Sequence, residues 1–102
     1  MHIISYKKIR EFCVKHPDAA GSFEHWYRII KHEKFDTFSD VKNLFPSADI
    51  VKNFVVFNVG GNKFRLIAFI NYKMNRLFIR HIMTHKVYNK KKWKEDEWFN
   101  SI

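Results

Sequence analysis

Two strand-like runs on either side of a glycine pair constrain the fold of this chain more than any other feature. Phe54–Val59 is rich in valine and phenylalanine, and a similar run over residues 62–72 follows the glycines at 60–61. Adjacent glycines readily adopt the positive φ angles of a two-residue hairpin turn. A further turn at residues 74–75 precedes a third run, Arg76–Thr84. We therefore expect three antiparallel strands in the second half of the chain.

The first half of the chain is patterned as helices after one short strand. His2–Ile4 is expected to form that strand, and Ser5 is expected to cap a helix over residues 6–15. Pro17 ends this first helix. Apolar side chains then recur at helical spacing over residues 18–33, which predicts a second amphipathic helix.

Helices followed by strands are typical of an α+β fold. A third, shorter helix is expected over residues 39–45, capped by Ser39 and ended by Pro46. We therefore predict an N-terminal helical hairpin packed on a small antiparallel sheet, which the first strand joins. The length suits a single domain over residues 1–102, with residues 90–102 considered as a C-terminal helical tail.

One cysteine among 102 residues limits how the chain is held together. Cys13 has no partner for an internal disulfide, and a zinc ribbon needs several cysteines, so the expected compartment is a reducing cytoplasm. No run approaches the roughly 18 apolar residues that span a membrane, so no membrane association is expected. A hydrophobic fraction of 46% provides enough apolar surface for one core.

Positive charge is concentrated in one part of the chain. Residues 63–94, called the basic segment below, contain ten Lys or Arg residues and no Asp or Glu. Residues 1–62 hold nine basic and seven acidic side chains, so the formal net charge of +9 is local. It falls on the predicted strands. A folded basic surface suits a polyanion, most simply the phosphates of a nucleic acid.

The assumed turns decide where these charges point. With two-residue turns in both hairpins, Val56 lies opposite Arg65, and Phe69 lies opposite Arg80. Lys63, Arg65 and Arg80 then share one face of the sheet. The face expected to pack on the helices carries Phe64, Leu66, Ala68, Ile70, Leu77, Ile79 and Met83. A one-residue slip at the second turn moves Arg80 to the opposite face.

A group of titratable side chains follows the last predicted strand, within reach of the basic face: His85, Lys86 and Tyr88. Two-metal phosphodiester chemistry needs carboxylate ligands, which the basic segment lacks, so no metal or cofactor is expected. Cleavage of RNA by its own 2′-hydroxyl needs only a base, an acid and positive charge. Arg65 and Arg80 suit the phosphate, and His85 titrates near neutral pH.

Residue chemistry alone leaves two functions open. Basic residues on a sheet face more often form a binding surface than a catalytic one. A histidine at a strand end, such as His85, is more often a surface or turn-capping residue than a catalyst. On residue types alone, nucleic-acid binding therefore ranks ahead of catalysis.

Several ordered segments resemble one known family. Residues 57–68, residues 78–80 and residues 83–88 resemble the signature of HigB-family toxins, within the RelE/ParE superfamily. Residues 16–19 and residues 40–49 are also similar to that family. The resemblance extends over about residues 1–90.

The resemblance implies both a fold and a function. HigB-family proteins have a RelE-like fold similar to microbial ribonucleases and are the toxins of type II toxin–antitoxin modules. They cleave mRNA, typically in the ribosomal A site, and are silenced by a HigA-like helix-turn-helix antitoxin. The expected partners of this chain are therefore mRNA, the ribosome and such an antitoxin, and translation inhibition is the expected effect.

The resemblance also assigns candidate site residues. The predicted catalytic residues are Arg65, Arg80, His85, Lys86 and Tyr88. The predicted RNA-binding residues add further members of the basic segment to those that the resemblance implies: Lys63, Arg65, Lys73, Arg76, Lys90, Lys91 and Lys92. The expected division places both arginines on phosphate and gives proton transfer to His85 or Tyr88.

Two features depart from the family pattern. Asn89 stands where family members usually carry an acidic residue after the motif tyrosine, and residues 90–102 are richer in Lys and Trp than is usual. A binding module with weakened catalysis is therefore one alternative to the endoribonuclease. A ParE-like toxin that poisons DNA gyrase is the other.

Overall fold

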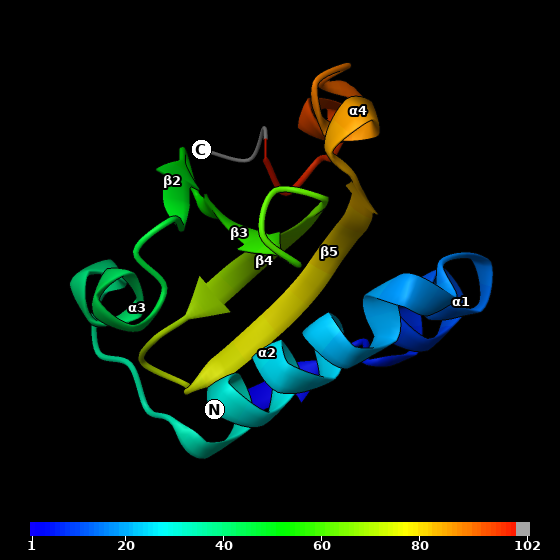
Figure 1. Ribbon diagram of the computed structural model, residues 1–102. Helices are drawn as coiled ribbons and strands as arrows, with labels where there is room; N and C mark the ends of the chain where they lie inside the picture. The colour runs from blue at the N-terminus through cyan, green and yellow to red at the C-terminus, as the bar shows by residue number, and fades with distance from the viewer. Residues whose placement is uncertain (100–102) are drawn as a thin grey trace.

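The structure, a computed structural model, describes residues 1–99 of the chain (Figure 1). Residues 100–102, the end of the predicted tail, lie outside the described residues. The helical elements are α1 (Lys7–Lys15), the 3₁₀ turn η1 (Pro17–Ala19), α2 (Ala20–His32), α3 (Phe38–Leu44), α4 (His85–Tyr88) and the 3₁₀ turn η2 (Lys92–Glu95). The strands are β1 (His2–Ile4), β2 (Asp49–Val51), β3 (Phe54–Val59), β4 (Phe64–Asn71) and β5 (Arg76–Thr84). The predicted α+β class is confirmed.

Two helix starts differ from the prediction. Tyr6, not Ser5, occupies the N-cap of α1, because Ser5 adopts a φ of 76° and turns the chain out of β1. The N-cap of α3 is Thr37, not Ser39. Asp40 fixes this start, since its carboxylate accepts hydrogen bonds from the backbone N–H groups of Asp36 and Thr37.

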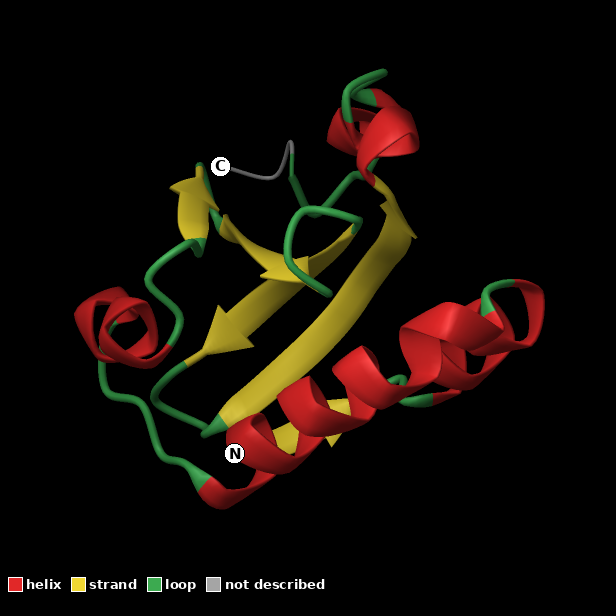
Figure 2. Ribbon diagram, viewed as in Figure 1, coloured by secondary structure: helices red, strands yellow, loops and turns green. Residues whose placement is uncertain are grey.

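The sheet is mixed, so the prediction of an antiparallel sheet is wrong for one strand. The strand order is β1-β5-β4-β3-β2, and β1 runs parallel to β5 while the other neighbours are antiparallel. The helical segments between β1 and the other strands form the long connection that a parallel pair requires. Figure 2 shows α1 and α2 lying together on one side of this sheet and α3 apart from them at the left. β2 was not predicted.

The glycine pair belongs to a longer loop than expected. Val59 pairs with Phe64 rather than with Asn62, so residues 60–63 form the loop between β3 and β4. Gly60 and Gly61 have φ angles of 65° and 66°, which a side chain would make costly. The register moves by two residues, and Arg65 lies opposite Asn58 instead of Val56. Because the move is an even number, Arg65 keeps its predicted face.

The β4–β5 pair contains a bulge that the sequence analysis did not anticipate. Ala68 pairs with Ile79 and Ile67 pairs with His81, which leaves Arg80 as the extra residue. The bulge shifts the alternation of the residues that follow it. Met83 therefore lies opposite Arg65, on the face away from the helices, and not in the helix-side core as predicted.

The main core lies between the helices and one face of the sheet. Phe23, Trp26 and Ile30 of α2 are buried there against strand residues such as Phe57 and Leu66. Trp26 packs edge-on against Phe57, with ring centroids 5.4 Å apart. This core fixes the orientation of β3, β4 and β5.

The opposite face of the sheet is covered by the C-terminal segment. Trp93 and Phe99 pack with buried residues of the strands, which are Phe54, Val56, Ile67 and Met83. Trp98 meets the rings of Phe69 and Phe78 edge-on. Since a second small core forms there, the face predicted to be an open basic surface is largely closed by the chain itself.

Candidate active site

Arg65 and His85 form the centre of the candidate site. Arg65 lies near the start of β4 and is only 6% exposed, and His85 begins α4 at the end of β5. The Arg65 Nη2 atom lies 2.6 Å from the Nδ1 atom of His85. The structure therefore brings together two of the predicted catalytic residues. They meet at the end of the sheet where the β3–β4 loop and α4 adjoin.

Protein oxygens saturate most of the Arg65 guanidinium. Nη2 donates to Asn62 Oδ1 at 2.6 Å, and Nη1 donates to the carbonyl oxygens of Asn62 and Phe64 at 3.3 and 3.1 Å. Asn62 was not among the predicted site residues. The Gly-Gly-Asn turn could have suggested its importance, because the loop brings its amide beside Arg65.

Backbone contacts hold His85 against Arg65. The His85 N–H donates to the carbonyl oxygen of Lys63 at 2.9 Å, so the β3–β4 loop positions both partners of the pair. Thr84 caps α4, and its Oγ1 accepts the N–H of Val87 at 3.3 Å. An arginine is always a donor, so Nδ1 of His85 is the acceptor, and the proton of the neutral ring lies on Nε2.

Tyr88 lies one helical turn beyond His85. Its ring stacks on Trp93 with centroids 5.3 Å apart, and the Arg65 Cζ atom lies 5.5 Å from the ring centroid. Burial raises the pKa of the Tyr88 phenol above its ordinary value of 10.0, and the positive charge of Arg65 opposes that rise. The phenol therefore carries its proton at neutral pH.

Arg80 is engaged by a different group, which we call the tail clamp: Arg80, His81, Asp96 and Trp98. The Arg80 guanidinium donates twice to Asp96, at 2.9 and 2.8 Å, and lies over Trp98 with its Cζ atom 3.8 Å from the ring centroid. His81 Nε2 lies 2.8 Å from the same carboxylate. The structure thus gives Arg80 protein partners of its own, apart from the contacts of Arg65 and His85.

The surroundings of the tail clamp shift the pKa values of Asp96 and His81. The Asp96 side chain is only 3% exposed, and its burial acts to raise its pKa. Hydrogen bonds from Arg80, the Trp98 N–H and His81 outweigh that effect and lower the pKa of Asp96 from 3.8 to about 2. Burial lowers the pKa of His81 below 6.5, and its hydrogen bond to Asp96 opposes this. Asp96 was not predicted, because only the folded tail brings it to β5.

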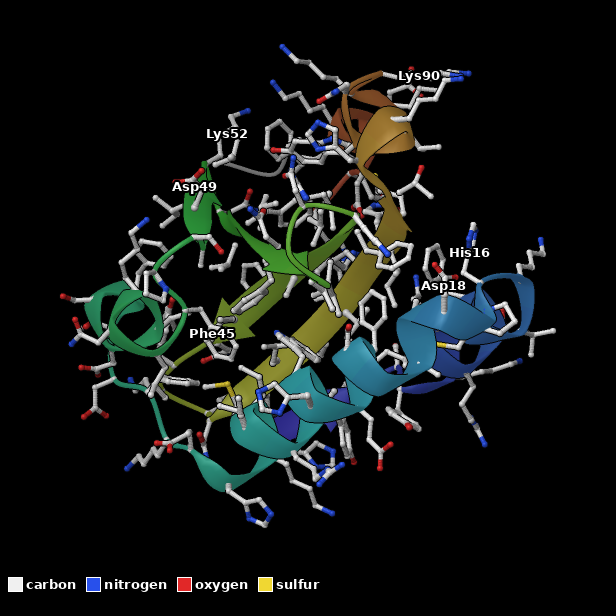
Figure 3. The ribbon with its side chains drawn as sticks, viewed as in Figure 1. His16, Asp18, Phe45, Asp49, Lys52 and Lys90 are labelled. Atoms are coloured by element: carbon white, nitrogen blue, oxygen red, sulfur yellow. The ribbon has the colours of Figure 1, made fainter. Side chains whose placement is uncertain are left out.

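The predicted lysines divide between two ends of the molecule. Those in the β3–β4 loop and around α4 are exposed beside the Arg65–His85 pair: Lys63, Lys86, Lys90, Lys91 and Lys92. Figure 3 shows Lys90 beyond α4. Lys73 and Arg76 are exposed at the β4–β5 turn, at the other end of these strands. The structure does not bring them to the candidate site.

Two other features are absent from the part of the chain that the structure describes. Within residues 1–99, no group of three or more His, Cys, Asp or Glu side chains is placed to hold a metal ion. Among the helices of the same residues, none is both long and apolar enough to cross a membrane.

The helices and the five-stranded mixed sheet form an α+β fold that is consistent with a RelE-like protein. Residues 19–91 match the HigB toxin family, described as the RelE-like toxic component of a toxin-antitoxin system. The mRNA interferase HigB of Escherichia coli O6:H1 is 39% identical over 93 residues, which cover 88% of this chain and 90% of that protein. The mRNA interferase toxin HigB of Escherichia coli K12 is 33% identical over 92 residues, covering 87% and 88%. The chain therefore belongs to the HigB family of RelE-like toxins.

Proposed function

We propose that this chain is the toxin of a type II toxin–antitoxin module and acts in the cytoplasm as an mRNA endoribonuclease. The relatives named as mRNA interferases support the activity. The observation that carries the proposal here is the Arg65–His85 pair, held at 2.6 Å in a setting rich in exposed lysines. Cleavage inhibits translation, and the ribosomal A site is where the toxin meets its mRNA. A HigA-like helix-turn-helix protein is the proposed antitoxin.

The proposed chemistry uses the RNA 2′-hydroxyl as the nucleophile. The substrate phosphate draws Nη2 of Arg65 away from His85, so the ring can carry its proton on Nδ1 and accept the 2′-hydroxyl proton at Nε2. The 2′-oxygen attacks phosphorus, and Tyr88 donates its proton to the departing 5′-oxygen. Lys63 and Lys86 offset the charge that develops on the phosphate. The products are a 2′,3′-cyclic phosphate and a 5′-hydroxyl.

Arg80 has a different place in this proposal. The sequence-based prediction puts it on phosphate, but its guanidinium is bound to Asp96 and Trp98. We propose that Arg80 contributes by holding the tail on the sheet, which keeps Trp93 stacked on Tyr88.

The products of cleavage test the proposal. On induced expression, primer extension should find new 5′ ends on a translated transcript and none on a matched transcript without a start codon. The upstream fragments should end in a 2′,3′-cyclic phosphate and the downstream fragments in a 5′-hydroxyl. A 5′-phosphate would contradict 2′-hydroxyl attack. Growth arrest without new RNA ends would favour the gyrase-poisoning or binding alternatives.

Asn62 is expected to be a positioning residue for this reaction. Replacing Asn62 with alanine removes the Oδ1 acceptor of Arg65 and lets the Arg65–His85 pair shift, so cleavage should slow by roughly tenfold or more. The pH dependence of the rate should also shift, because the partner of His85 is less firmly held. The control is Asn43→Ala, on the exposed surface of α3. Equal rates and equal pH profiles for wild type and Asn62→Ala would contradict this role.

A further inference from the structure

One edge of the sheet is only partly occupied. β1 pairs with residues 76–78 of β5 and ends at Ile4, because Ser5 adopts a φ of 76° and turns the chain toward α1. Within the part of the chain that the structure describes, no strand pairs with this edge of β5 beyond Phe78. Such an edge presents backbone N–H and C=O groups to a further strand.

A groove of about 610 Å³ lies between this edge and α1, and we call it the β5 groove. Apolar residues make up much of its lining: Phe12, Val14, Ile82, Met83 and Val87. Val14, on the α1 side of the groove, is 80% exposed. The groove therefore offers both apolar contacts and a strand edge.

Lys8 donates a hydrogen bond to a backbone carbonyl of this edge, as the backbone of an added strand would. Its Nζ atom donates to the carbonyl oxygen of Arg80 at 2.9 Å. This carbonyl belongs to the bulge residue, where regular pairing with a further strand would be interrupted. The lysine thus occupies the bulge and leaves residues 81–84 as the more regular part of the edge.

The charges around the β5 groove favour an acidic occupant. Lys8 and Lys15 line it from α1, whereas the charge of Arg80, which lines it from β5, is already paired with Asp96. The acidic residue in the lining is Glu11, which lies 3.6 Å from Lys7 in an exposed ion pair. A segment with Asp or Glu side chains beside its apolar residues would complement this rim.

We propose that the β5 groove binds an extended, acidic segment of the antitoxin, which adds a strand to the sheet beside residues 81–84 of β5. The proposal rests on membership of a toxin–antitoxin family and on the free edge, and it does not depend on mRNA cleavage. Alternate side chains of the added strand enter the apolar groove, and its backbone pairs with β5. Because Val87 of α4 also lines the groove, the bound segment lies next to the candidate active site.

Four surface variants test this contact by titration with the antitoxin encoded beside this chain. Val14→Asp places a charge on the apolar wall, and Lys15→Glu reverses the rim charge. Each should weaken binding by about tenfold or more. The matched controls are Ile50→Asp on β2 and Lys34→Glu after α2, both exposed and outside the groove. Both controls should bind as the wild type does, and binding of the wild type should weaken as salt is raised.

Amide hydrogen exchange on the unaltered toxin tests the added strand directly. In the complex, residues 81–84 should become protected, together with the face of α1 that lines the groove. The proposal fails if both groove variants bind as tightly as wild type. It also fails if protection appears only around Arg65 and His85, or if the wild-type toxin does not bind this antitoxin. Since RNA is absent from these assays, a failure here is separate from a failure of the proposed cleavage.

Discussion

Replacing Asp96 with alanine is expected to lower the free energy of unfolding by about 3 kcal/mol. The substitution removes the carboxylate that accepts two hydrogen bonds from Arg80 and one from His81. Arg80 and His81 are then left partly buried on the sheet without that partner. The tail also loses its anchor, because the Trp98 N–H donates to the same carboxylate at 2.8 Å.

The loss should depend on pH in a defined direction. The pKa of Asp96 is lowered from 3.8 to about 2 by folding, so its contribution is present above pH 4 and is lost as pH falls from 4 to 2. That contribution is roughly 2 kcal/mol from the pKa difference alone. His81 acts in the same sense: its folded pKa lies below 6.5, so its stabilising effect is lost as pH falls through that value. Unfolding by urea at several pH values, for wild type and Asp96→Ala, measures both effects.

Two further variants separate the clamp from a general effect of charge. Glu97→Ala removes an exposed carboxylate next to Asp96 and should change stability by less than about 0.5 kcal/mol. The double variant Arg80→Ala/Asp96→Ala should lose less stability than the two single variants added together, because each single variant strands a charged partner. If the losses in free energy of unfolding of the two single variants add up to that of the double variant, the contact between Arg80 and Asp96 contributes nothing to stability. A loss of toxicity in Arg80→Ala alone therefore cannot identify Arg80 as catalytic, since the variant also weakens the fold.

The sequence was sufficient for the elements whose pattern is local. The apolar runs located β3, β4 and β5, and helical spacing located α1 and α2. The α+β class followed from that order. These features depend on side chains within a few residues of each other, which a pattern in the chain records directly.

Register and tail packing depend on contacts that no local pattern records. A Gly-Gly pair is compatible with turns of more than one length, so the four-residue loop at 60–63 could not be distinguished from a tight turn. No pattern within β5 marks the bulge at Arg80. The side chain of Arg80 binds Asp96 and Trp98, which lie far along the chain in the tail. Arg65 remained on its expected face because the register moved by two residues. Arg80 shares that face by its alternation from Phe78, since both side chains contact Trp98, and the bulge lets His81 reach Asp96 as well.

Part of the candidate site could be predicted, because some of its residues belong to a local pattern. His85 and Tyr88 follow a strand end, where side chains gather beside the neighbouring loop, and the motif marked both. The role of Asn62 depends on the shape of the loop, and the contacts of Arg65 depend on that loop and on the side chains of His85 and Tyr88. A sequence pattern can therefore name candidate site residues but cannot say which of their side chains the fold already binds to other parts of the chain.

The second large effect is expected at His85. Replacing His85 with alanine should slow RNA cleavage by about 10²–10⁴-fold, because the proposed reaction loses its proton acceptor. The fold should be retained, since His85 is only partly buried and its backbone bond to Lys63 does not need the side chain. The measurement is the single-turnover cleavage rate on a translated message, with cooperative melting confirmed for the variant. His32→Ala, an exposed histidine at the end of α2, is the matched control and should cleave normally.

A second substitution distinguishes proton transfer from simple support of Arg65. Asparagine at this position, His85→Asn, provides an amide oxygen near the place of Nδ1, so Arg65 keeps an acceptor, but the amide cannot take up a proton near neutral pH. If His85 transfers a proton, His85→Asn should be as inactive as His85→Ala. If His85 serves only to hold Arg65, His85→Asn should restore most of the activity that His85→Ala loses. In that case proton removal from the 2′-hydroxyl would have to be assigned to another group beside the Arg65 guanidinium.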